Sequence, residues 1–194
     1  ARGNVAPAAG AAEGSDWQPW IAKLEEIDQQ LLKANSERDL AQLNGQRADV
    51  IERLIGTLPA DQRDTWVRQF ADTVSAAIQS GQYPAGPERL ERFYRQVERD
   101  VTDPELRGYV KFRWISAEYG QELSESMKKP DADVAAIQKD WLAKLSQYVA
   151  DFPGTPDAAE AMLQLAIAEE FSGNDSDTTR WYSRIISDIP EESR

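Results

Sequence analysis

The side chains available for chemistry in this sequence are carboxylates, hydroxyls and amines. The 194 residues contain no cysteine and no histidine, which removes thiolate nucleophiles, imidazole bases and the ligands that zinc, copper and iron prefer. Glu160, Glu169 and Glu170 come nearest to paired catalytic carboxylates, but no other reactive group converges on them. We interpret them as the polar side of a helix. The sequence therefore predicts no catalytic residue and no cofactor in this chain.

A cluster of oxygen ligands after residue 173 has some features of a calcium site. Asn174, Asp175 and Asp177 supply oxygen atoms at short intervals, as calcium-binding loops do. The cluster lacks the glycine and the final glutamate that complete an EF-hand loop. Capping of a helix start by Asp175 or Asp177 is the favoured interpretation, and we expect no metal.

Three arginines along one helical face form a candidate anion site. Arg92, Arg95 and Arg99 lie three or four residues apart and could bind an acidic peptide or a phosphate. Glutamates are interspersed with them, namely Glu88, Glu91 and Glu98. A solvated face of mixed charge explains this pattern better than an anion site does.

The six tryptophans are candidates for a ligand platform. Five of them, on the apolar stripe of their segments, are expected in the core: Trp17, Trp20, Trp66, Trp141 and Trp181. The sixth, Trp114, lies close in sequence to Tyr109, Lys111 and Arg113, and aromatic residues with arginine are typical of binding surfaces. A core position is favoured for Trp114, and a contact in a groove is the alternative. We therefore take Tyr109, Lys111, Arg113 and Trp114 as a possible partner-binding groove.

The charge balance argues against a nucleic-acid partner. The formal net charge is -12, and residues 151–194 hold ten acidic side chains against three arginines. Nucleic-acid affinity depends on clustered lysine and arginine that neutralise phosphates, so an acidic chain of this kind would be repelled. No apolar run reaches the roughly 18 to 20 residues that span a bilayer, and we expect no membrane insertion.

Apolar residues recur at helical spacing from residue 16 onward, and glycine or proline closes most segments. No segment shows the sustained period of two that is typical of a strand. The sequence predicts an all-α fold of antiparallel helix hairpins, with about eight helices. The expected helices fall within residues 15–31, 35–58, 59–81, 87–101, 103–120, 130–152, 155–173 and 181–189.

Composition and pattern divide the chain into three parts. Residues 1–15 are rich in alanine, glycine and proline, with little to bury, so we expect a disordered leader or linker. Residues 16–58 are expected to form a helical hairpin, and residues 59–194 a series of helix pairs whose last unit is incomplete. One order of features recurs over residues 90–120 and 145–173: a helix, an Xaa-Pro start and a helix closed by glycine. Such recurrence is typical of stacked helix pairs.

Residues 148–190 combine an aromatic-x-x-x-Phe-Pro run, a helix of small side chains, a glycine turn and a closing proline. The residues are Tyr148, Phe152, Pro153, Ala158, Ala159, Ala161, Ala166, Gly173, Tyr182 and Pro190. In these features the segment resembles a tetratricopeptide unit of bacterial envelope proteins. The family usually has alanine where this chain has Thr178 and Thr179. The resemblance implies a short right-handed solenoid of helix pairs.

The order of leader, helical region and terminal tetratricopeptide-like unit is similar to the N-terminal helical part of TlpA-like thioredoxin-fold proteins. That resemblance implies a parent chain in which a redox domain with a Cys-x-x-Cys site follows. Residues 1–15 are of the kind that follows an export signal or lipoprotein anchor, which favours the periplasm or cell envelope; a linker explains them equally well, leaving the cytoplasm open.

The sequence supports two main functional hypotheses; a third, an independent enzyme acting on a small ligand, would need a carboxylate pocket that no motif indicates. The favoured one is a non-catalytic helical-repeat scaffold that binds a protein or an adjacent domain. The alternative is the helical leader of a thiol-disulfide oxidoreductase, in which case the parent would be an enzyme although this chain is not.

The last expected helix carries an apolar stripe, formed by Trp181, Tyr182, Ile185, Ile186 and Ile189. Five large residues exceed what one alanine-rich neighbouring helix can cover, so we expect part of the stripe to be exposed. Self-association through this C-terminal helix is therefore a possible interaction.

Overall fold

Eight α-helices make up residues 16–189, the part of the chain that the computed structural model describes, and this part contains no strand. The helices are α1 (Gln18–Leu31), α2 (Glu37–Thr57), α3 (Ala60–Gln79), α4 (Gly86–Asp100), α5 (Pro104–Ser126), α6 (Val134–Asp151), α7 (Pro156–Phe171) and α8 (Asp175–Asp188). The predicted all-α class is confirmed for these residues. The expected leader, residues 1–15, and the closing Pro190 lie outside the described residues.

Short polar side chains start several helices where the sequence indicated. Ser36 caps α2 and Thr155 caps α7; each accepts a hydrogen bond from the backbone N–H three residues ahead, at 3.0 and 3.2 Å. Asp103 and Asp133 cap α5 and α6 through backbone N–H groups as well. These caps satisfy N–H groups that have no partner within the helix.

The predicted side-chain cap of α8 is wrong. Asn174 occupies the capping position and makes no side-chain cap bond, while Asp175 and Asp177 lie within the first turn. There the two carboxylates favour the positive end of the helix dipole. Asp177 also forms an ion pair with Arg180 at 3.2 Å.

Glycine ends two of the helices but not a third. Gly81 follows α3 with a φ of 71° and Gly173 follows α7 with a φ of 75°, a left-handed conformation that glycine adopts without strain. The expected end of the fifth helix at Gly120 is wrong, because α5 continues to Ser126. Gly120 lies inside this helix, where a Cβ atom would meet nothing within 4 Å.

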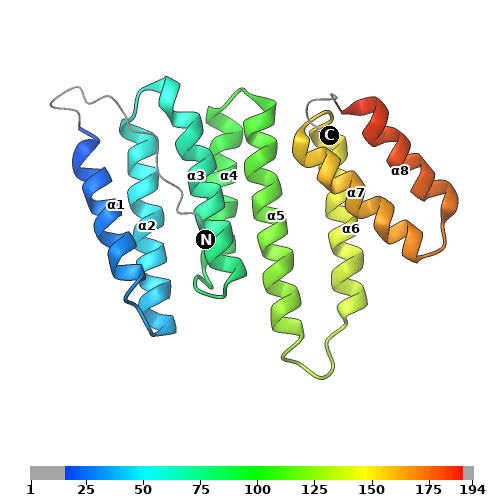
Figure 1. Cartoon of the computed structure of the whole chain (residues 1–194), viewed down its shortest axis with the longest axis horizontal. Coiled ribbons are helices and arrows are strands. Elements are labelled where there is room, and N and C mark those ends of the chain that lie inside the picture. The colour runs from blue at the N-terminus through cyan, green and yellow to red at the C-terminus, as the bar shows by residue number, and fades with distance from the viewer. Residues whose placement is uncertain (1–15, 190–194) are drawn as a thin grey trace.

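The helices lie side by side in chain order (Figure 1). Each one packs on the next along the chain, and α5 also contacts α3 and α7. In this view, α7 and α8 run obliquely to α5 and α6. Of all the helices, α5 therefore has the widest set of neighbours, drawn from both halves of the chain.

Aromatic pairs join neighbouring helices in the core. The ring centroids of Phe70 and Phe93 lie 3.9 Å apart between α3 and α4, and Tyr119 stacks on Trp141 at 4.7 Å between α5 and α6. Trp114, Trp141 and Trp181 are buried, whereas Trp17, Trp20 and Trp66 are partly buried against the core.

No helix among the described residues is long and apolar enough to cross a membrane.

Candidate functional site

The candidate groove residues all come from α5, but they lie on different sides of it. Tyr109 and Arg113 are four residues apart and share one face, whereas Lys111 and Trp114 project from another. The two pairs contact different helices: Tyr109 and Arg113 contact α3, whereas Lys111 and Trp114 contact α4. The structure therefore does not bring the four side chains together in one groove.

Tyr109 and Arg113 connect α5 to both α3 and α7. The phenol of Tyr109 donates to the carboxylate of Asp72 on α3, at 2.6 and 2.7 Å from its two oxygens. Arg113 donates through Nε to Asp72 at 3.0 Å and through Nη1 to Asp157 on α7 at 3.2 Å. One guanidinium thus joins three helices by charge-assisted hydrogen bonds.

Two guanidinium groups lie over the ring of Tyr109. Arg113 and Arg68 approach its centroid to 4.2 and 4.6 Å, distances typical of cation–π contacts. Burial and the hydrogen bond to Asp72 raise the pKa of Tyr109, so its hydroxyl remains a donor at neutral pH. Arg68, Asp72, Tyr109, Arg113 and Asp157 form what we term the α5 ion cluster.

Asp157 is the most enclosed carboxylate of the α5 ion cluster, with 16% of its side chain exposed. Burial raises the pKa of this carboxyl above its usual value, while the charge and hydrogen bonds of Arg113 oppose the rise. Arg113 pairs with Asp72 and Asp157, and Arg68 pairs with Glu105 at 3.0 Å. Because every charge in the cluster has a partner of opposite sign, the cluster suits the fixing of α7 against α5 better than the binding of a ligand.

Lys111 and Trp114 lie on the side of α5 that faces α4. Trp114 is buried and packs against Tyr94 with ring centroids 5.6 Å apart. The Nζ atom of Lys111 lies 4.0 Å from the centroid of Trp114, and burial together with Arg95 lowers the pKa of Lys111. Trp114 thus occupies a core position, the interpretation favoured from the sequence.

The arginine face of α4 has the mixed charge that the sequence suggested. Arg95 forms ion pairs with Glu91 at 3.6 Å and with Glu98 at 3.7 Å, all on one exposed face. Glu98 also accepts a hydrogen bond from the hydroxyl of Tyr94 at 3.0 Å. No anion site is needed to account for these side chains.

The three candidate carboxylates do not converge either. Glu160 accepts from Gln164 at 2.9 Å, and Glu169 accepts from Asn174 at 2.7 Å. Glu170 is exposed at the end of the same helix. Across residues 16–189 no group of three or more acidic side chains is arranged to hold a metal ion.

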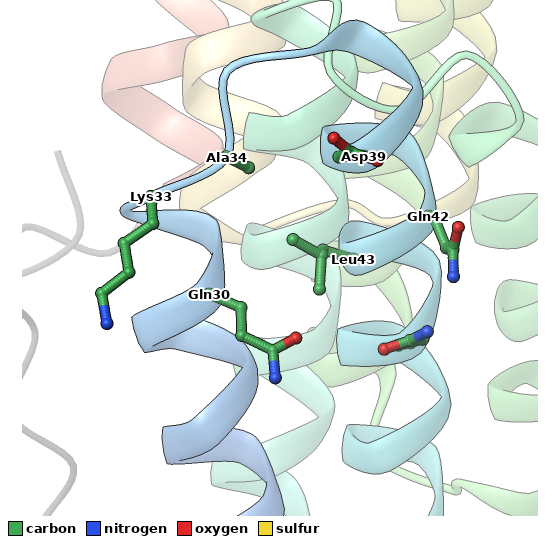
Figure 2. Close-up of a pocket in the computed structure, with 7 residues that line it drawn as sticks. Gln30, Lys33, Ala34, Asp39, Gln42 and Leu43 are labelled. Carbon is green, nitrogen blue, oxygen red and sulfur yellow. The ribbon is translucent and has the colours of Figure 1, made fainter.

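Two shallow pockets occur on the N-terminal helices. The larger, of about 490 Å³, is lined by Asp49, Glu52 and Arg53. The second, of about 370 Å³, lies between α1 and α2 (Figure 2), where the amide and charged side chains outnumber the apolar ones. It is lined by Gln30, Lys33, Ala34, Asp39, Gln42, Leu43 and Gln46. Neither pocket has the apolar lining with a few convergent polar groups that marks a typical ligand site.

Five exposed apolar side chains gather on α7 and α8, and we term them the apolar end face. They are Leu163, Ile167, Phe171, Tyr182 and Ile186. The side chain of Phe171 is 90% exposed and that of Ile186 is 63% exposed. The stripe of the last helix is exposed in part, as expected: Tyr182 and Ile186 are exposed, Ile185 is partly buried, and Trp181 and Ile189 are buried.

Sequence reasoning missed the contribution of α7 to this face. Leu163, Ile167 and Phe171 follow one another at intervals of four residues, which places them on one side of a helix. The opposite side of α7 is buried through three alanines together with Met162 and Leu165.

Comparison with protein-family models, curated proteins and solved structures finds no match to this chain.

Proposed function

We propose that this chain is a non-catalytic helical scaffold module that binds a protein partner or an adjacent domain. The observation that supports this most directly is the apolar end face. Exposed apolar side chains are ordinary when scattered singly, but a contiguous group of large ones is typical of an interaction surface. The five side chains of this face come from two adjacent helices.

The order of the helices supports a finer proposal for the fold. Successive helices pack on one another, and the α6–α7 region carries the aromatic, proline and alanine features of residues 148–190. We propose that these pairs stack as a short right-handed solenoid of tetratricopeptide type. In such a stack the outer side of the last pair is where a further element packs.

The α5 ion cluster has a supporting role in this proposal. Tyr109 and Arg113 are occupied by bonds to Asp72 and Asp157, so a partner would have to break those bonds to reach them. The cluster instead holds the start of α7, and through it the apolar end face, against α5. We therefore propose the end face as the binding surface in place of the α5 groove.

Site-specific photo-crosslinking in cells that produce the protein tests this function. A photoreactive phenylalanine analogue would replace Phe171 in one variant and Met127 in the control. Met127 is 78% exposed but lies at the far end of α5. We expect a discrete crosslinked product, to a partner or to an adjacent domain, from position 171 only. Equal products from both positions, or none from either, would contradict the proposal.

A further inference from the structure

The apolar end face has the dimensions of a short helix. Leu163 and Phe171 are separated by eight residues of α7, a rise of about 12 Å at 1.5 Å per residue. Tyr182 and Ile186 lie one turn apart on α8, which packs along α7. The hydroxyl of Tyr182 lies 3.5 Å from the carboxylate of Glu170, the residue before Phe171, so the Tyr182 side chain reaches the α7 part of the face.

The basic residues of α8 are already paired. Arg184 forms an ion pair with Asp188 at 3.0 Å and Arg180 one with Asp177 at 3.2 Å. Both guanidinium groups also lie over the ring of Trp181, 5.2 and 5.5 Å from its centroid. They are therefore poorly placed to neutralise acidic groups beside the end face.

Two carboxylates beside the end face have only uncharged partners among the described residues. Glu160 lies one turn before Leu163 and accepts from the amide of Gln164, and Glu170 lies near Tyr182. Neither forms an ion pair with a lysine or arginine of residues 16–189. The apolar end face is thus bordered by negative charge in a chain whose net charge is -12.

We propose that the apolar end face binds an amphipathic helix of about three turns with a basic margin. Its apolar side chains, at intervals of three or four residues, cover Leu163, Ile167, Phe171, Tyr182 and Ile186. Lysine or arginine beside that stripe contacts Glu160 and Glu170. This inference rests on the proposed function and specifies the chemistry of the partner.

Charge favours a basic helix over two alternative occupants of the apolar end face, a second copy of the chain and an anionic lipid surface. A second copy of the chain would bring the same acidic border against itself, and like charges facing each other across an interface oppose association. An anionic lipid surface attracts basic segments and would be repelled by this border. A basic helix satisfies both the apolar residues and the carboxylates.

A binding titration with a synthetic helix tests the inference. The probe is a fluorescent peptide of about 14 residues, with leucines at intervals of three and four, lysines beside them and alanines elsewhere. Fluorescence anisotropy is followed as the full chain is added. We expect saturable binding that Phe171→Ser and Ile186→Ser each weaken about tenfold or more. Met127→Ser, a matched exposed control, should leave it unchanged.

A double variant, Glu160→Gln with Glu170→Gln, tests whether the two carboxylates contribute to binding. We expect this variant to bind the lysine peptide less tightly and with a weaker dependence on salt. A peptide with glutamate in place of lysine should not bind. If the serine variants bind the lysine peptide as the wild type does, the attraction comes from net charge alone and the inference is wrong.

Two further outcomes would overturn the inference in favour of another occupant. One is a dimer of the wild-type chain in sedimentation that Phe171→Ser removes. The other is binding to anionic vesicles that Phe171→Ser removes. If the basic peptide fails while crosslinking from position 171 still yields a discrete product, the scaffold function stands and only this inference falls; failure of both removes the function as well.

Discussion

Replacing Arg113 by methionine should weaken the attachment of α7 to α5 in a pH-dependent way. Methionine keeps an unbranched apolar stem but removes the bonds to Asp72 and Asp157. Removing one partner from a fully buried ion pair costs about 3 to 5 kcal/mol. Here the side chains of Arg113 and Asp157 are 28% and 16% exposed, so we expect a smaller loss of about 2 kcal/mol at pH 7.

The pH dependence follows from the carboxyl group left behind. The pKa of Asp157 is raised in the folded chain by burial, and Arg113 restrains that rise. The native state therefore holds this proton more tightly than the unfolded chain, and ionisation of Asp157 costs stability as pH rises through the folded pKa. Without Arg113 the folded pKa rises further, so the penalty of Arg113→Met should be largest at neutral pH and shrink under acidic conditions.

Urea unfolding followed by circular dichroism at several pH values measures this difference. Arg95→Met is the matched control, because Arg95 is an exposed arginine with ion pairs of 3.6 and 3.7 Å, and its loss should cost under about 0.5 kcal/mol. Asp157→Asn introduced into the Arg113→Met background should recover part of the stability at pH 7. A penalty that is independent of pH, or equal in the Arg95 control, would refute the conclusion that Arg113 stabilises the ionised form of Asp157.

Four other substitutions have definite expected effects on thermal or urea unfolding. Gly86→Ala should destabilise by about 1 to 3 kcal/mol, because its Cβ would lie 2.8 Å from Cδ1 of the buried Ile78; a neutral result would mean that α4 can shift freely. Gly120→Ala should instead stabilise α5 by about 0.5 to 1 kcal/mol, since the added methyl meets nothing. Thr155→Ala should cost about 1 kcal/mol through the lost cap of α7. Phe171→Ser should change the unfolding midpoint little, since this side chain is 90% exposed, and a large loss would show that it packs within the chain.

Local signals predicted helix starts and several ends well, but not all of them. The proline at position 156 and the hydroxyl of Thr155 mark the start of α7, and Gly173 marks its end, because each acts within a few residues. Gly120 gave the wrong end for α5. A single glycine costs a helix only about 1 kcal/mol, and packing of α5 against its neighbours outweighs that cost.

The arrangement of the candidate site residues could be predicted from sequence spacing only in part. Helical spacing could have separated Lys111 from Tyr109, because residues two apart do not share a helix face. The partners of Arg113 could not be predicted, since Asp72 and Asp157 lie 41 and 44 residues away in the chain. Only the α8 part of the apolar end face could be predicted from the sequence. Apolar residues occur almost all round α7, so their pattern does not show which side a neighbouring helix covers.

The ordering of the helices has a mechanical consequence. Each helix packs on the next along the chain, and the main contacts of α8 are with α7. Apart from the packing of α5 on α3 and α7, the contacts follow chain order, so cohesion is largely a sum of interfaces between neighbouring helices. Under a pulling force, the terminal helices α1 and α8, each held mainly by one neighbour, should detach before the helices between them. A partner helix bound at the apolar end face would raise the force at which α8 detaches from α7.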